Sequence, residues 1–406
     1  MSHPVGPGAW VRIFLPFALG YYLSYLLRTV NAVISPQLTT DLGLSPADLG
    51  LMTSAYFLTF GLAQVPLGIA LDRYGPRRVE GGLLLLAALG ALAFALGDSR
   101  AELGLARGLI GLGVSACLMA GLKGFAMWYP HERQSSMTGF IMASGALGAL
   151  TASAPLEALL PLLGWRGVFW VIAFAALATA VFIFASLPDE AAHASHDTIG
   201  QALGSVGHIF ASGVFLKFAA SATFFTGGFM ALQSLWVVPW LMNVNGLPLA
   251  GAAGYMLVLN LGMLCGQLSI GLLGTRFARR GVKPVHLMQA GFAGMLLVEL
   301  AIVSDAGAVG PMWFVLGVLS CVNSQSYLAT ASQFPQAVFG RVSTAINLMA
   351  FVGAFVVQWG LGLAVDVLRA DAWTMPDALR AALAGLIALQ FISFVPLVIR
   401  PTRVRG

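Results

Sequence analysis

Long apolar runs without charged residues recur along the whole of this 406-residue sequence. Only 9% of its residues are charged and 58% are hydrophobic, whereas an ordinary globular domain is about 25% charged. A continuous apolar run of about 20 residues is long enough to cross a bilayer as a helix. The runs do not alternate between polar and apolar residues as the strands of a membrane barrel would. The sequence therefore predicts an all-α membrane protein.

Charged, Pro-rich and Gly-rich breaks divide the sequence into twelve predicted membrane-spanning helices. The predicted spans are residues 11–38, 47–72, 79–97, 101–128, 134–160, 165–187, 209–242, 249–275, 284–304, 308–334, 341–368 and 376–399. The longest polar stretch lies between the sixth and seventh spans. We therefore expect an N-terminal six-helix bundle at 1–187, a cytoplasmic linker at 188–207 and a C-terminal six-helix bundle at 208–406.

The basic residues predict how these helices are oriented, because cytoplasmic segments of membrane proteins carry an excess of Lys and Arg. With a cytoplasmic N-terminus, thirteen Lys and Arg residues fall on the cytoplasmic side and four on the opposite side. We expect a multi-pass protein of the bacterial inner membrane with both termini in the cytoplasm. This asymmetry accounts for most of the net charge of +5, so no nucleic acid partner is expected. The expected partners are membrane lipid and a small-molecule substrate, and the expected state is a monomer.

The two halves of the sequence repeat each other at an offset of 203 to 205 residues. Pro36-Gln37-Leu38 corresponds to Pro239-Trp240-Leu241, and Tyr129-Pro130 corresponds to Phe334-Pro335. A nearly constant offset between separate landmarks indicates two parallel repeats, which is typical of transporters built from two similar halves.

Two motifs in the first half resemble signatures of the major facilitator superfamily. Residues 68–78 read GIALDRYGPRR, which is similar to the family loop G-x-x-x-D-R-x-G-R-R with one proline inserted. Residues 107–113 read RGLIGLG, which is similar to the family pattern R-x-x-x-G-x-G. The resemblance implies two pseudo-symmetric six-helix bundles, a substrate site at the membrane midplane and transport by alternating access.

The same resemblance implies a set of gating or structural residues. They are Asp72, Arg73, Gly75, Arg77, Arg107, Arg133 and Arg341. Arg107 can be interpreted in two ways. It is either a residue that couples steps of the transport cycle or a packing arginine near the outer surface of the membrane.

Arg28 lies near the middle of the first predicted span, where an unpaired charge is costly. Tyr21, Ser24, Tyr25 and Asn31 share its helical face at spacings of three and four. A polar face on a spanning helix indicates a cavity. Arg28 therefore either binds the substrate or links helices through backbone carbonyl groups.

The arginine three residues before Asn31 is also similar to sugar-phosphate permeases of this superfamily, which bind phosphate with an arginine on the first span. Those permeases carry a matching basic residue on the seventh span, whereas this sequence has Ala231 at the position symmetric to Arg28. A guanidinium group binds a carboxylate bidentately as well as a phosphate. We therefore predict that the substrate is a small organic anion, either a carboxylate or a phosphate ester.

Other predicted spans carry polar and aromatic side chains that are further candidate substrate contacts. They are Tyr56, Gln64, Thr226, Gln233, Trp236, Asn260, Asn323, Tyr327, Asn347 and Gln358. Some of them are expected only to link helices, because polar side chains commonly bridge spans.

Carboxylates are expected to lie away from the middle of the cavity helices. Asp72 and Glu80 fall at predicted cytoplasmic helix ends, and Glu299 falls on a peripheral span. This pattern favours uniport or anion exchange over symport driven by a protonated side chain. Lys123 is expected to add a second positive charge to the cavity beside Arg28.

An enzyme needs a nucleophile, a metal cluster or an acid and base in one pocket, and the sequence shows none of these. We expect no catalytic residue, no metal and no cofactor. Other functions remain open on the same fold: a proton-coupled exporter of drugs or lipophilic compounds, an importer of siderophores or peptides, and a non-transporting membrane sensor.

Overall fold

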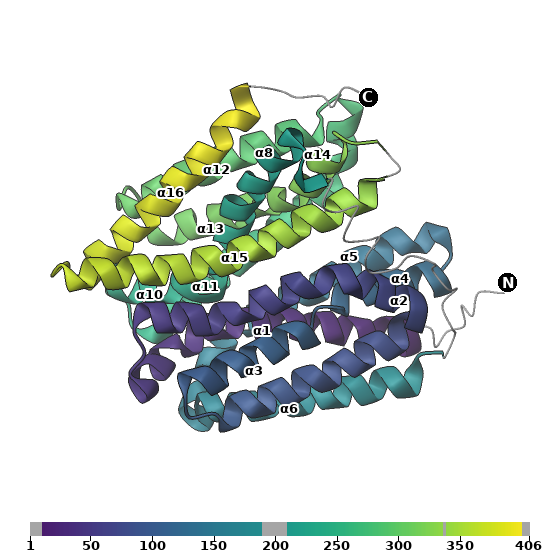
Figure 1. Ribbon diagram of the computed structural model, residues 1–406, viewed down its shortest axis with the longest axis horizontal. Coiled ribbons are helices and arrows are strands. Elements are labelled where there is room, and N and C mark those ends of the chain that lie inside the picture. The colour runs from purple at the N-terminus through teal and green to yellow at the C-terminus, as the bar shows by residue number, and fades with distance from the viewer. Residues whose placement is uncertain (1–9, 189–208, 336–337, 400–406) are drawn as a thin grey trace. The chain divides into compact units, whose positions relative to one another are not determined.

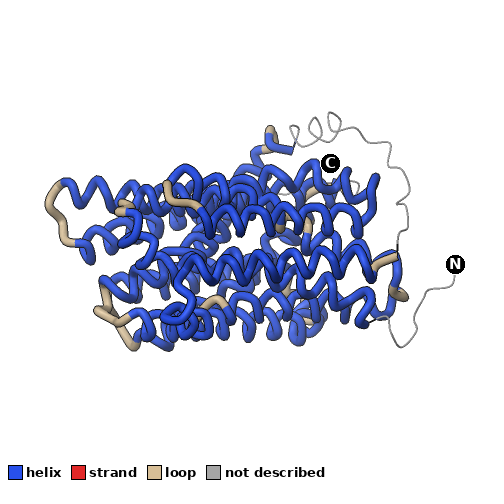
Figure 2. Tube along the Cα trace, turned by 90° about the horizontal axis from the view of Figure 1, so that it is seen from below, coloured by secondary structure: helices blue, strands red, loops and turns tan. Residues whose placement is uncertain are grey.

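The protein is all-helical in the computed structural model, which describes residues 10–188, 209–335 and 338–399. Within those ranges the chain forms helices and short connections and contains no strand (Figures 1 and 2). The prediction of an all-α membrane protein is therefore confirmed.

The helices of the first half, in chain order, are η1 (Trp10–Phe14), α1 (Leu15–Leu42), α2 (Pro46–Leu96), α3 (Arg100–Gly113), α4 (Cys117–Trp128), α5 (His131–Thr151) and α6 (Ala154–Ser186). Those of the second half are α8 (Gly213–Ser221), η2 (Ala222–Thr226), α9 (Gly227–Ala231), η3 (Leu232–Trp236), α10 (Val237–Asn243), α11 (Leu249–Arg279), α12 (Pro284–Val303), α13 (Val309–Leu319), η4 (Ser320–Val322), α14 (Asn323–Ala331), α15 (Phe339–Ala370) and α16 (Met375–Ile399).

Nine helical stretches among the described residues are long and apolar enough to cross a membrane. The other three predicted spans coincide with the first part of α2, with α5, and with α13, η4 and α14 taken together. The helix of the predicted tenth span is interrupted at Ser320–Val322, where three residues form a 3-10 helix. Helical residues make up most of every predicted span, although the predicted fifth span runs past the end of α5 into α6. This arrangement is consistent with twelve crossings.

A sharp bend divides α2 into the predicted second and third spans. Gly75 has φ 78° and ψ 163°, and a side chain is unfavourable at such a positive φ, whereas glycine adopts it readily. Pro76 follows directly, and proline suits the first turn of a helix because it has no backbone N–H to leave unpaired. The glycine of the predicted signature loop is thus required by the backbone conformation.

The chain divides into two compact units, which are described separately below. Unit 1 contains Met1–Leu38 and Ala55–Ala202, and unit 2 contains Thr39–Ser54 and Leu203–Gly406. Figure 1 shows α1, α3 and α6 running in a common direction, as the helices of a bundle do. Apart from Pro188, the predicted linker lies outside the described residues, and the predicted domain boundaries stay predictions.

Residues 39–54 belong to unit 2 because the start of α2 is bound to α15. The Asp366 carboxylate accepts hydrogen bonds from the Ser45 hydroxyl at 2.7 Å and from the Ala47 backbone N–H at 3.0 Å. A carboxylate at a helix N-terminus satisfies free N–H groups and interacts favourably with the helix dipole. Further along, Gln358 donates to the Thr53 hydroxyl at 2.6 Å.

Candidate functional site

Arg28 lies in unit 1 among aromatic side chains from α1 and α2. Its guanidinium carbon is 4.4 Å from the centre of the Tyr25 ring and 5.5 Å from that of Phe60, and its side chain also hydrogen-bonds Tyr56. The side chain is only 5% exposed. Aromatic faces attract a cation, so the local packing holds the guanidinium in a fixed position on α1.

Arg107 of α3 brings a second guanidinium group to the same aromatic cluster. It is 1% exposed, its Nη1 donates to the Leu27 carbonyl oxygen at 2.9 Å, and its guanidinium carbon is 5.0 Å from the centre of the Tyr56 ring. Packing of α3 against α1 and α2 buries Arg107, which fits a packing arginine as well as a residue of the transport cycle, so both interpretations stay predictions. Tyr56 therefore contacts two arginines that come from different helices.

The glycine motif of α3 explains how Arg107 reaches this position. A Cβ atom at Gly111 would lie 2.2 Å from the Tyr56 carbonyl oxygen, so α3 approaches α2 as closely as a helix without a side chain allows. Thr59 of α2 adds a hydrogen bond of 2.7 Å to the Gly108 carbonyl oxygen. Arg107 lies four residues before Gly111 and so shares its helical face.

The polar face predicted on α1 is buried, and part of it has no partner. The Ser24 hydroxyl and both side-chain polar atoms of Asn31 make no hydrogen bond within the described residues, and each of the two side chains is 1% exposed. These residues stand four before and three after Arg28, on the same helical face. Buried polar groups without partners are costly, by about 1–3 kcal/mol each, so this face is suited to a polar ligand.

The polar candidates of unit 2 instead bind one another across helices. The pairs, with the donor first, are Thr226 with Asn323 (3.2 Å), Gln233 with Asn260 (2.7 Å), Tyr327 with Asn347 (2.9 Å) and the Trp236 indole with the Gln358 carbonyl oxygen (3.1 Å). Such pairs hold neighbouring membrane helices together. Gln64 of unit 1 likewise donates to the carbonyl oxygens of Phe60 and Ser115, at 3.2 and 3.3 Å.

The signature loop forms contacts inside unit 1. Asp72 makes an ion pair with Lys123 of α4, so the expectation that Lys123 adds charge beside Arg28 is wrong. Arg77 donates to the Phe184 carbonyl oxygen at 2.5 Å and ties the loop to α6. The guanidinium carbon of Arg73 lies 5.4 Å from the Tyr74 ring centre.

The two other predicted gating arginines are exposed. Arg133 lies on the first turn of α5, and Arg341 lies on the first turn of α15. No contact of their side chains assigns them a role.

Sequence reasoning missed the burial of Glu80. Its expected place at a cytoplasmic helix end stays a prediction. Its side chain is 0% exposed, because α1 and α4 cover it. The only sequence signal was its neighbourhood, since Gly81 and Gly82 follow it directly and glycines permit close packing.

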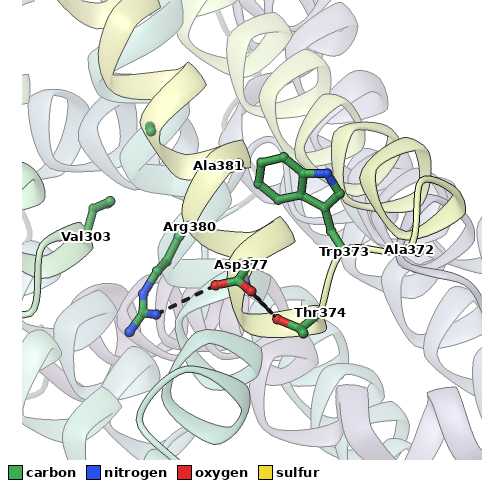
Figure 3. A pocket seen from close by; sticks show the side chains of 8 residues that line it. Val303, Ala372, Trp373, Thr374, Asp377, Arg380 and Ala381 are labelled. Atoms are coloured by element: carbon green, nitrogen blue, oxygen red, sulfur yellow. Dashed lines mark hydrogen bonds and ion pairs between the residues drawn. The ribbon is translucent and has the colours of Figure 1, made fainter.

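An open hollow lies at one end of unit 2, between the end of α12 and the start of α16 (Figure 3). Its volume is about 510 Å³, and Arg380, Asp377 and Trp373 line it. Asp377 accepts a hydrogen bond from Thr374 at 2.6 Å, and Arg380 is paired with Asp305. None of the predicted substrate contacts lines this hollow. Within the described residues, no group of three His, Cys, Asp or Glu side chains could hold a metal ion.

Comparison with known sequences gives one family. The family described as Major Facilitator Superfamily matches residues 17–357 of the chain. The "Hexuronate transporter" of Escherichia coli is 30% identical over 178 residues, which cover 43% of this chain and 39% of that protein. The "Probable L-galactonate transporter" of the same organism is 29% identical over 150 residues, or 37% of this chain and 33% of that protein. Each of these two matches therefore spans less than half of the relative.

A third relative matches along almost its whole length. The "Probable sulfoacetate transporter" of Cupriavidus necator is 21% identical over 408 aligned positions, which cover 93% of this chain and 92% of that protein. Among solved structures, a bacterial homologue of the human lysosomal transporter Spinster has a TM-score of 0.76 at 15% identity and covers 97% of both chains. A D-xylose-proton symporter has a TM-score of 0.76 at 15% identity, over 97% of this chain and 98% of that one. At such identities these structures show the fold alone.

Proposed function

The chain belongs to the major facilitator superfamily, and from that premise we propose that it carries a small organic anion across the bacterial inner membrane by alternating access, with Arg28 as the group that binds the anion. Members of this family are transporters, so the prediction that the chain is not an enzyme is confirmed. The relatives named for hexuronate, L-galactonate and sulfoacetate all carry organic acids by name. They support the anionic class of substrate proposed here.

The observation that carries the proposal is the buried polar face of α1. Arg28 supplies a positive charge, while Ser24 and Asn31 supply hydrogen-bonding atoms that no described residue satisfies. A guanidinium group can bind both oxygens of a carboxylate in one plane, and the neighbouring hydroxyl and amide can bind the remaining polar groups of the anion. Arg107, which also contacts Tyr56, adds a second positive charge close by.

The ligand class can be tested with pairs of compounds that differ only in charge. Purified protein in detergent should be stabilised against thermal unfolding by galacturonate, L-galactonate or sulfoacetate. Galactose, which has the ring of galacturonate but no carboxylate, should not stabilise it. Proteoliposomes should then take up the best anion with saturable kinetics. If galactose or an organic cation stabilises the protein more than any anion, the proposal is wrong.

Replacing Asn31 with leucine should separate binding from stability. Leucine has the same branched arrangement of side-chain heavy atoms and removes two buried polar atoms without partners, so we expect the free energy of unfolding to rise by about 1–3 kcal/mol. The affinity for the anion should fall about tenfold or more, because a hydrogen bond to a charged ligand contributes about 1.5–3 kcal/mol. Denaturant titration and ligand-induced thermal shifts measure the two effects.

Gln233→Leu is the matched control for stability. It also replaces a buried amide, but it leaves Asn260 without its 2.7 Å donor, so stability should fall by about 1–3 kcal/mol. If Asn31→Leu also lowers stability, its amide has a structural partner and the binding role loses its main support.

The orientation of the chain gives a further prediction. Reporter fusions placed within residues 188–207 and at the C-terminus should both report cytoplasm, because the predicted arrangement puts thirteen basic residues on that side and four on the other. A fluorescent protein should be bright at both positions and alkaline phosphatase should be inactive. Phosphatase activity from a fusion at 188–207 would contradict the predicted arrangement of six spans before the linker.

A further inference from the structure

Glu80 of α2 is buried in unit 1 against α1 and α4, and we refer to these surroundings as its pocket. The residue stands one turn after the bend at Gly75 and is 0% exposed. A Cβ atom added at Gly20 of α1 would lie 2.3 Å from its Oε1 and 3.6 Å from Leu84. The bare backbone of Gly20 therefore forms one wall of the pocket, and a larger residue there would displace the carboxyl group.

The carboxyl oxygens of Glu80 have no hydrogen-bond partner of ordinary geometry in the described part of the chain. From α4, the Cys117 thiol faces the carboxyl group, and a thiol is only a weak donor. On α2 itself, the Arg77 guanidinium is one turn away and donates to the Phe184 carbonyl oxygen of α6. From α1, the charge of Arg28 acts on the same Cys117 thiol.

An ionised carboxylate cannot remain in such a pocket, because burial of an unpaired charge is far more costly than burial of a neutral group. A protonated carboxyl group is neutral and can be accommodated among apolar walls. The described conformation therefore holds a proton on Glu80. Release of that proton requires a conformation in which α1 or α4 moves away and admits water.

We propose that Glu80 is a proton-binding site that loads and unloads once in each transport cycle, so that the anion and one proton cross the membrane together. This inference rests on the proposed anion site at Arg28. It replaces the expectation of uniport or anion exchange, which depended on the absence of a carboxylate between the helices.

Electrostatics links the two sites along α1. Gly20 and Arg28 are eight residues apart, which is about 12 Å along a helix at a rise of about 1.5 Å per residue. The positive charge of Arg28 favours loss of the proton from Glu80, and a bound anion neutralises that charge. At an effective dielectric constant of about 20, the interaction changes an equilibrium constant about tenfold, equivalent to about 1.4 kcal/mol.

The linkage is reciprocal by thermodynamic necessity. An anion at Arg28 strengthens proton binding at Glu80, and a proton at Glu80 strengthens anion binding by the same factor. With both sites occupied, Glu80 is neutral and the anion balances the charge of Arg28. With both sites empty, the negative charge of Glu80 balances the positive charge of Arg28. These two states are the ones suited to the conformational change of a symporter.

The direct test uses the wild-type protein in weakly buffered detergent with a pH indicator. Addition of the anion found in the ligand screen should cause net proton uptake, and the affinity for that anion should fall about tenfold as the pH rises through one midpoint. Glu80→Gln is a permanently neutral side chain of the same shape. It should bind the anion with an affinity that does not vary with pH, and it should exchange anions across proteoliposomes but lose accumulation driven by a pH gradient.

Glu299→Gln is the matched control, because Glu299 of α12 is the other fully buried glutamate among the described residues and belongs to unit 2. It should keep the pH dependence and the driven accumulation. Cys117→Ala should keep them too, which separates the carboxyl from the thiol.

The outcomes distinguish this inference from the proposed function. If no organic anion binds, the proposed function is wrong, and with it the coupling of Glu80 to an anion. If an anion binds but wild-type protein takes up no proton and its affinity is the same at every pH, the anion site stands and the proton site at Glu80 is wrong. If Glu80→Gln does not fold, the wild-type proton uptake and its persistence in Glu299→Gln still decide the question.

Discussion

Arg28→Gln should abolish saturable anion uptake and ligand-induced stabilisation while the protein remains folded. Loss of the guanidinium group leaves a bound anion with no opposite charge in a buried place, and removal of one partner of a buried charged pair costs about 3–5 kcal/mol. The affinity should therefore fall by more than about 100-fold, since each 1.4 kcal/mol is about tenfold. Uptake into proteoliposomes and thermal shifts with the best anion measure the two effects.

Arg28→Lys should give an intermediate result. Lysine keeps the positive charge but loses the planar pair of donors that fits a carboxylate. We expect binding to weaken by about 1–3 kcal/mol. A lysine variant as weak as the glutamine variant would show that geometry, and not charge alone, determines binding.

Arg166→Gln is the control for loss of one arginine from unit 1. Arg166 lies over the Trp165 ring, as Arg28 lies over Tyr25, but its side chain is 40% exposed and paired with Asp98. Exposed ion pairs contribute about 0–1 kcal/mol, so transport should be unchanged. If Arg28→Gln transports as well as Arg166→Gln, Arg28 is a packing residue and the organic-anion proposal is wrong.

The helices of this protein could be predicted from the sequence because apolar runs and charge breaks are local signals. The predicted break between the second and third spans coincides with the bend at Gly75, where glycine and proline are the local signal. An exception arises where no such signal exists. The break at Ser320–Val322 carries neither glycine nor proline, so the sequence offers no sign of it.

The α1 part of the candidate site was also predictable, because residues three and four apart on one helix must share a face. Tyr25 and Arg28 lie together as expected. The neighbours of Arg107 and Glu80 could not be predicted, since they depend on which helix covers each side chain. Glycines determine that approach, and a single sequence does not state which helix a glycine faces.

Polar residues in different helices pose a related difficulty. Gln233 and Asn31 are alike in the sequence, as amides within apolar spans. In the structure Gln233 binds Asn260 of α11 at 2.7 Å, whereas Asn31 has no partner among the described residues. Only the packing of the helices shows which amide links helices and which is available to a ligand.

Packing at Gly111 determines the place of Arg107, and its substitution gives the second large effect that we expect. In Gly111→Ala the new methyl group would lie 2.2 Å from the Tyr56 carbonyl oxygen and 2.7 Å from the Thr59 hydroxyl. The Tyr56 carbonyl oxygen belongs to the backbone of a packed helix and cannot rotate away as a side chain could, so α3 and α2 must separate. We expect the free energy of unfolding to fall by about 3 kcal/mol, the upper end for overpacking, and anion affinity to fall with it as Arg107 and Tyr56 move.

Gly82→Ala is the matched control, because a Cβ atom at Gly82 of α2 meets nothing within 4 Å. Alanine favours the helix over glycine by about 1 kcal/mol, so this variant should be as stable as wild type or more so. The two alanine substitutions should therefore differ by roughly 4 kcal/mol in denaturant titrations, from the sum of these two effects. Equal stabilities of the two variants would show that α3 and α2 are not in close contact at Gly111. The placement of Arg107 beside Tyr56 depends on that contact and would then be wrong.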